Sequence, residues 1–228
     1  MPIFRIHLRL LVFTAAVLTL VSAADASQLL TRSALQTSLG GLGTLEDFES
    51  YSIGAATSDS GPALLDSTAS FGSQGPGLVV PGVSFLGNTL HWNGVGHLGA
   101  PSREIWSTLS YLTIDFGPAV DAFGVDLRTF VGSPATVTMT IFSTDDTTVL
   151  GALANISLLT DGIPVFAGWN DSAGIGKVEL TLSSAYRSAI IDNVEFGSAT
   201  AAPEPSAFLL FVLGLAGLGI VALRRPRN

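Results

Sequence analysis

Residues 136–141 read Thr-Val-Thr-Met-Thr-Ile, a strict alternation of hydroxyl and apolar side chains. Successive side chains of a β-strand point to opposite faces of the sheet, so this period of two indicates a half-buried strand with its threonines outward. Residues 177–182, Lys-Val-Glu-Leu-Thr-Leu, alternate in the same way. The two runs predict a domain built from β-strands.

Further runs of apolar and β-branched residues lie on both sides of these two. We expect strands at Leu45–Ser50, Leu78–Phe85, Tyr111–Phe116, Ala122–Leu127, Thr136–Phe142, Thr148–Ala154, Val165–Trp169, Lys177–Ser183 and Ala189–Phe196. Turn residues separate the runs at Gly117-Pro118, Gly132-Ser133-Pro134, Asp145-Asp146, Asp161-Gly162 and Gly174-Ile175-Gly176. Short strands with such turns are typical of an all-β fold, an antiparallel β-sandwich or jelly roll.

The middle of the chain also holds one helical pattern and two long polar segments. Leucines and alanines at helical spacing between Ser27 and Leu39, followed by Gly40-Gly41, predict a short N-terminal helix. Residues 52–76 and 86–108 are rich in Gly, Ser and Pro, so we expect long loops there. Loops of that length on a β scaffold often bind ligands.

The N-terminal residues have the pattern of a secretory signal peptide. A short basic segment precedes an apolar run from Leu10 to Val21, and small residues follow that run. We assign residues 1–26 to the signal peptide, because cleavage fits the small-residue rule after Ala23, Ala24 or Ala26. The alternative is a membrane-anchoring first helix, which the short apolar run disfavours.

The C-terminus carries three features in a fixed order. Pro203-Glu204-Pro205 is followed by an apolar segment at residues 207–223 and then by the basic residues Arg224, Arg225 and Arg227. The segment is close to the minimum length for crossing a bilayer, so we expect a transmembrane helix there. Basic residues favour the cytoplasmic side, which places the middle of the chain outside the inner membrane. A simple tail anchor is the alternative.

This C-terminal order resembles the PEP-CTERM sorting signal over residues 203–227. The resemblance implies that an exosortase, a membrane transpeptidase-like protease, recognises Pro203-Glu204-Pro205 and releases or transfers the protein. It also implies a Gram-negative host that makes exopolysaccharide. The expected location is the inner membrane before processing, then the cell surface or extracellular matrix.

The middle of the chain is acidic and lacks cysteine. Residues 27–202 hold five basic and sixteen acidic residues, a net charge of −11, whereas the whole chain carries −8. Such a surface repels phosphate backbones, which excludes nucleic acid as a partner. Without disulfides the domain depends on its core or on a metal. We divide the chain into a signal peptide (1–26), an extracellular β-sandwich domain (27–197), a spacer (198–202) and the sorting signal (203–227).

Short motifs in the middle of the chain resemble β-sandwich domains of PEP-CTERM proteins and galactose-binding-like jelly rolls. They are Asp47-Phe48-Glu49, the stretch 116–127, Phe166-Ala167-Gly168 and the stretch 191–196. In many such jelly rolls an acid near the first strand and one on the last strand share a structural calcium ion. The resemblance therefore implies a calcium site at Glu49 and Asp192, with Asp47 assisting. The alternative is that these are solvated acids at strand ends.

Aromatic residues beside amides indicate where a glycan would bind, since sugars stack on flat apolar rings and hydrogen-bond to fixed polar groups. Two segments have this composition, and the candidate residues are Trp92, Asn93, Trp106, Trp169 and Asn170, with His91, His97 and Asp171 nearby. The alternative is that the tryptophans belong to the core, as tryptophan is usually largely buried.

Catalytic patterns are weak in this sequence. It contains no Gly-x-Ser-x-Gly elbow, Walker loop or dinucleotide fingerprint, and the lack of cysteine excludes thiol catalysis. We therefore expect a non-enzymatic surface or matrix protein that binds exopolysaccharide or another envelope glycan. One alternative is a structural or adhesive protein acting through protein contacts, and the other is a secreted hydrolase.

Overall fold

The computed structural model describes residues 26–198, apart from residues 131, 133, 160 and 184–186. Strands dominate this part of the chain, and every pairing between them is antiparallel, which confirms the all-β prediction. The strands are β1 (Ser27–Leu29), β2 (Thr44–Glu46), β3 (Ser58–Ser60), β4 (Leu64–Leu65), β5 (Val83–Leu86), β6 (Leu90–Asn93), β7 (Glu104–Ser107), β8 (Tyr111–Arg128), β9 (Ala135–Ser143), β10 (Val149–Leu158), β11 (Val165–Leu182) and β12 (Ile190–Gly197).

Among the described residues two segments are helical: the α-helix α2 (Arg32–Ser38) and the 3₁₀-helix η1 (His97–Gly99). In the described part of the chain, neither helix is long and apolar enough to cross a membrane. The candidate cleavage positions Ala23 and Ala24, the sorting motif and the expected helix at 207–223 lie outside the described residues.

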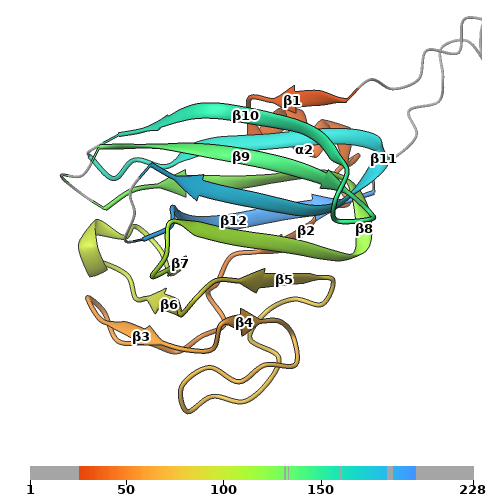
Figure 1. Cartoon of the computed structure of the whole chain (residues 1–228). Helices are drawn as coiled ribbons and strands as arrows, with labels where there is room; N and C mark the ends of the chain where they lie inside the picture. The colour runs from red at the N-terminus through yellow and green to blue at the C-terminus, as the bar shows by residue number, and fades with distance from the viewer. Residues whose placement is uncertain (1–25, 131, 133, 160, 184–186, 199–228) are drawn as a thin grey trace, which may run out of the picture. The chain divides into compact units, whose positions relative to one another are not determined.

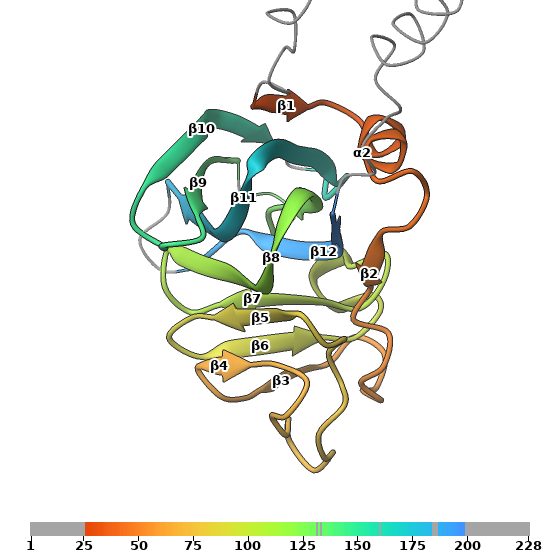
Figure 2. The same ribbon diagram turned by 90° about the vertical axis from the view of Figure 1, so that its right-hand side faces the viewer.

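The long strands β8 and β11 organise the sheet (Figures 1 and 2). They pair with each other along most of their length, and each changes its second neighbour midway. The first part of β8 pairs with β5, while its last part pairs with β12. Likewise, β11 pairs with β1 near its start and with β9 towards its end. One set of strands therefore continues to β9 and β10, the other continues through β12 to β7, β6 and β3, and both share β8 and β11.

One large apolar core joins the two sets of strands. Met139 of β9, from the first set, and Ile105 of β7 and Ile191 of β12, from the second, are all fully buried members of one cluster. The alternation read from residues 136–141 and 177–182 is confirmed, because Val137, Met139 and Ile141 and also Val178, Leu180 and Leu182 are buried. These residues face the core because the strand period of two places them all on one side.

The predicted turns at Gly117-Pro118 and at Gly174–Gly176 were wrong, since both lie inside long strands. In β11 the register with β8 shifts between Asn170 and Ile175 and again before Lys177, so the strand bulges there instead of ending. Gly176 allows this geometry, because an added Cβ would lie 2.7 Å from the backbone oxygen of Ser143. Glycine inside a strand often marks such a bulge.

The N-terminal helix is shorter than expected. Residues 27–29 pair with β11 as β1, so the helix covers only Arg32–Ser38. Thr31 caps its start, with its side-chain oxygen accepting a hydrogen bond from the Ala34 N–H at 3.1 Å. Leu35 and Leu39 pack under the helix in a small second apolar cluster.

The two expected long loops contain short strands. β3 and β4 lie within residues 52–76, and β6, η1 and β7 lie within residues 86–108. Strands of two to four residues are too short for periodicity to reveal them, so composition alone misread these segments. Their outer strand β3 ends the second set of strands.

Candidate functional site

Trp92 belongs to the core and does not offer a stacking surface. Its side chain is fully buried, and its indole N–H donates to the backbone oxygen of Phe48 at 3.0 Å. The rings of Phe48, Tyr51 and Phe71 lie around it, at centroid distances of 5.0–5.7 Å. Asn93, next along β6, is also fully buried. Burial removes both residues from the predicted glycan-binding set.

Trp106 lies half-buried on β7 between two other rings. It stacks on His91, its cross-strand neighbour, with ring centroids 4.2 Å apart and planes 14° apart. Phe130 meets it edge-on at 5.1 Å. The indole N–H donates to the Asn93 side-chain oxygen at 3.1 Å, so these two candidate residues contact each other. Aromatic neighbours restrict the ring face that a sugar would use.

Trp169 and Asn170 lie where β1 joins β11. The Asn170 side-chain oxygen accepts hydrogen bonds from the N–H and the hydroxyl of Ser27, at 3.1 and 2.5 Å. Trp169 packs over Gly151 of β10, so closely that a Cβ there would lie 2.4 Å from the ring. Its indole nitrogen is buried without a hydrogen-bond partner among the described residues. Asn170 therefore connects β11 to β1, and Trp169 packs β11 against β10. Trp106 lies on another strand, β7.

A buried polar network lies beneath Trp106. Glu104 and Arg128 form an ion pair in which both side chains are almost fully buried. Asn93 donates to Glu104 at 3.0 Å, and Arg128 also donates to the backbone oxygen of Leu98 at 3.4 Å. Burial raises the pKa of Glu104, and the Arg128 guanidinium opposes that rise. The network fixes the segment between β6 and β7 to the sheet.

Glu49 and Asp192, the predicted calcium ligands, contact neighbouring residues of that same segment. Arg103 forms an ion pair with Glu49, and the Arg103 backbone N–H also donates to it at 2.9 Å. The Ser102 hydroxyl donates to Asp192, as does the Asn193 N–H at 2.7 Å. Each carboxylate therefore has donors from the chain. No group of three or more acidic or histidine side chains that could hold a metal occurs among residues 26–198 outside the gaps, so calcium stays a prediction.

Asp192 has a strongly perturbed environment. Burial raises its pKa to about 7, and the nearby carboxylates of Glu104 and Asp126 act in the same direction, against the lowering effect of its two hydrogen bonds. Asp126 lies directly opposite Asp192 on β8 and forms an ion pair with Arg32 of α2 at 3.0 Å. The same arginine reaches Glu195 at 3.0 Å. Arg32 therefore connects the helix α2 to an acidic residue of β8 and to one of β12.

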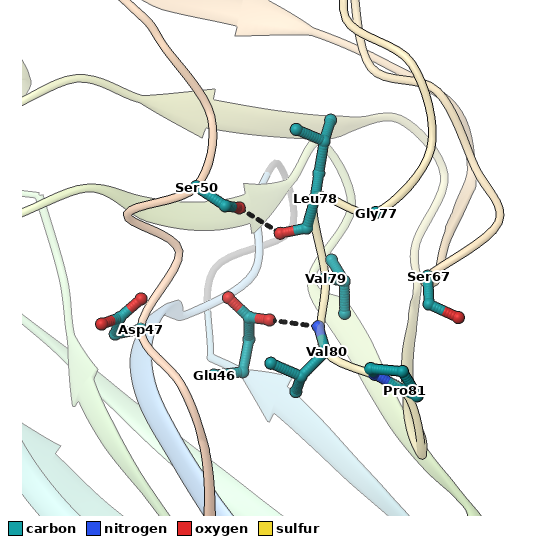
Figure 3. Close-up of a pocket in the computed structure, with 9 residues that line it drawn as sticks. All are labelled: Glu46, Asp47, Ser50, Ser67, Gly77, Leu78, Val79, Val80 and Pro81. Atoms are coloured by element: carbon teal, nitrogen blue, oxygen red, sulfur yellow. Dashed lines mark hydrogen bonds between the residues drawn. The ribbon is translucent and has the colours of Figure 1, made fainter.

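A pocket of about 410 Å³ opens beside the turn that follows β2 (Figure 3). Its two main walls come from segments that were predicted as the strands Leu45–Ser50 and Leu78–Phe85, and Ser67 comes from a predicted long loop. The lining residues are Glu46, Asp47, Ser50, Ser67, Gly77, Leu78, Val79, Val80 and Pro81. A pocket of this size falls in the range of small-ligand sites.

Glu46 holds the two walls of the pocket together. One carboxylate oxygen accepts from the Phe48 N–H and the other from the Val80 N–H, both at 2.7 Å. The side chain is almost fully buried, and burial raises its pKa although these two hydrogen bonds oppose the rise. Ser50 donates to the backbone oxygen of Leu78 across the same gap, as Figure 3 shows. The pocket is therefore braced on both sides.

Asp47 supplies the exposed polar group of the pocket. It follows Glu46 directly, is exposed, and accepts the Glu49 N–H at 3.1 Å on one carboxylate oxygen. A carboxylate accepts hydrogen bonds from ligand hydroxyls, and the Ser67 hydroxyl can both donate and accept. Leu78, Val79 and Pro81 give an apolar wall. Together these groups suit a small ligand with hydroxyls and an apolar face.

Sequence reasoning singled out Asp47 only as an assistant ligand and missed the pocket. The acidic residues between 46 and 49 mark one wall of the pocket in the sequence. The opposite wall at 77–81 has the composition of the start of a strand, so the sequence did not indicate that the two segments meet. The chain matches no protein-family model, and no curated protein matches it.

Proposed function

We propose that this chain is an exported, non-enzymatic protein of the cell surface or extracellular matrix, whose β domain binds envelope polysaccharide. The N-terminal signal-peptide pattern and the C-terminal order of Pro203-Glu204-Pro205, apolar segment and arginines support export and sorting by an exosortase. We further propose that the two sets of strands form the layers of a jelly-roll-like β-sandwich, which their common core supports.

The braced pocket at Asp47 is the observation that carries the binding proposal. An exposed carboxylate, a serine hydroxyl and an apolar wall can receive the hydroxyls and the C–H face of one sugar unit. The domain carries a net charge of −11, and Glu46 and Asp47 line the pocket. Like charges repel, so the ligand in this proposal is an uncharged sugar rather than a uronic acid.

Co-sedimentation with the host's own exopolysaccharide tests this proposal. The processed protein is compared with the variants Asp47→Asn and Glu179→Gln, in calcium and in EDTA. The Asp47→Asn substitution keeps the side-chain shape and the acceptor for the Glu49 N–H but removes the charge-assisted bond to the ligand, so we expect roughly ten- to a hundredfold weaker binding. Glu179→Gln removes a half-buried charge on β11 that pairs with Lys177 and does not line the pocket, so this variant should bind normally.

The possible results test polysaccharide binding, the pocket and calcium separately. No binding by the folded wild type overturns the polysaccharide function and favours a role in protein contacts. Equal binding by Asp47→Asn and wild type removes the pocket from the proposal. Binding that requires calcium supports the expected site at Glu49 and Asp192, and binding retained in EDTA shows that calcium is not needed for recognition.

A further inference from the structure

The strand β10 has ten residues and lies at the end of the strand order, paired on one side with β9. Figures 1 and 2 both place it at the periphery of the described domain. In antiparallel strands every second residue directs both its N–H and its C=O to the same side. Along β10, the side away from β9 carries such groups with no pairing strand among the described residues.

Other strands with a single pairing partner in this domain are short. β1, β2 and β3 have three residues each, and β4 has two. β3 also carries an acid, Asp59, in its middle. Short length, charged side chains and bulges are the usual means by which proteins prevent edge strands from pairing with other chains. β10 is long and uncharged, and its two register shifts leave the stretch between them as its open edge.

The hairpin that ends in β10 is free of charged residues in its strands. None of the nineteen residues of β9 and β10 is Asp, Glu, Lys or Arg, although sixteen acids are spread over residues 27–202. Ala152 and Ala154 are exposed on β10, and the β9 threonines at 136, 138 and 140 are half-buried. Two copies of a domain with a charge of −11 repel each other, so a neutral edge is where they can meet at the lowest electrostatic cost.

We propose that β10 pairs antiparallel with β10 of a second copy of this chain, extending the sheet across a two-fold axis. The register shifts between Val149 and Gly151 and between Leu153 and Ile156, and Asn155 has a φ of 58°. A bulge twists an edge away from a straight partner, so the pairing is confined to residues 151–153, between the two shifts, and is centred near Ala152. The second copy contributes the same residues, because both subunits of a two-fold dimer use the same surface at the contact.

This arrangement goes beyond polysaccharide binding, and it does not depend on it. Two copies joined at β10 keep their Asp47 pockets on separate chains, so the dimer presents two sites to one polymer. Long-range repulsion between the copies is screened by salt. Dimerisation is therefore expected to strengthen as ionic strength rises, opposite to an association driven by opposite charges.

Cysteine cross-linking of the full chain tests the pairing, because the natural sequence contains no cysteine. The variant Ala152→Cys places a thiol near the proposed axis, and Thr181→Cys places an exposed thiol on the interior strand β11. With a short bismaleimide in the intact host, Ala152→Cys should give a covalent dimer and Thr181→Cys should stay monomeric. Equal cross-linking of the two variants, or none from Ala152→Cys, overturns the proposal.

Charge placed on the edge gives a second readout without a cross-linker. Ala152→Lys brings two lysines together across the axis and should abolish the dimer seen by sedimentation velocity, while Thr181→Lys changes the net charge equally and should keep it. If Ala152→Lys fails to fold, the cysteine pair decides. A wild-type chain that sediments as a monomer at both low and high salt contradicts the proposal outright, and binding of a different protein at this edge would do the same.

Discussion

Asp192 lies on the last strand, as its motif indicated, but its contacts include residues that the sequence did not point to. The closing motif indicated an acid on the last strand, and β12 does place it beside the segment that contacts Glu49. What the sequence could not show is that Ser102 and Arg103 approach these carboxylates, because that depends on the path of the chain between β6 and β7. Long-range contacts of this kind leave no local pattern.

Stability at neutral pH should depend on Asp192. Its folded-state pKa of about 7 lies above the ordinary value of 3.8, so the folded protein holds this proton more tightly than the unfolded chain. The stabilising contribution is complete below the unfolded pKa and is lost as the pH rises through 7. We expect the free energy of unfolding to fall by up to about 1.4 kcal/mol per pH unit in this window from this group.

Urea unfolding at about pH 5 and about pH 8 measures this dependence. Asp192→Asn removes the titrating group and should flatten the profile relative to wild type. The substitution Glu179→Gln, at a half-buried acid of β11 away from Asp192, serves as the control and should leave the slope unchanged. Identical slopes for Asp192→Asn and wild type would contradict the assignment.

The tryptophans illustrate the limit of composition at the scale of single residues. Trp92, Trp106 and Trp169 look equivalent in sequence, each beside or near an amide. In the structure one is in the core, one lies between rings at the surface and one packs over a neighbouring strand. The inward or outward direction of a side chain depends on strand register, and the short strands β6 and β7 gave no periodic signal.

At the scale of elements, strands with strict alternation were predicted well and bent strands were not. β9 was found almost residue for residue, whereas β8 and β11 were each divided at glycine-containing sequences. Gly-Pro and Gly-x-Gly are turn signals in most contexts. Here the sheet pairs on both sides of these positions, and tertiary pairing overrides the local preference.

The contact between β10 and β11 predicts a selective effect of one glycine. Gly151→Ala places a methyl group against the ring of Trp169, at 2.4 Å in the present geometry. Overpacking of this kind should lower the free energy of unfolding by about 1–3 kcal/mol. Gly75→Ala is the matched control, because nothing lies within 4 Å of its Cβ position. Thermal unfolding compares the two, and equal midpoints would show that Trp169 moves aside without cost.

At the scale of the whole molecule, an acidic β domain lies between two terminal segments with separate signals in sequence. The domain was assigned to residues 27–197, and the described residues from 26 to 198 are mostly β-strand, with short strands that the sequence did not reveal. The end segments were recognised from the order of charged, apolar and small residues rather than from packing. Their proposed roles rest on that order alone.

Processing of the C-terminus provides the test at this scale. Replacing Pro203 and Glu204 with alanine should leave the full chain in the inner-membrane fraction of a host that has an exosortase, because the proposed recognition sequence is lost. Ser206→Ala changes the residue just after the motif and should be processed normally. Fractionation followed by mass measurement of the chain separates the two, and normal release of the double variant would contradict the sorting proposal.

The sharing of β8 and β11 by both sets of strands affects how the domain resists proteolysis. Neither set is complete without these two strands, so opening of β8 or β11 disrupts both sets at once. A protease that needs several residues of extended chain from β8 or β11 would have to wait for the domain to unfold, whereas peripheral strands can open locally. Resistance of these two strands to digestion would then be set by the rate of global unfolding.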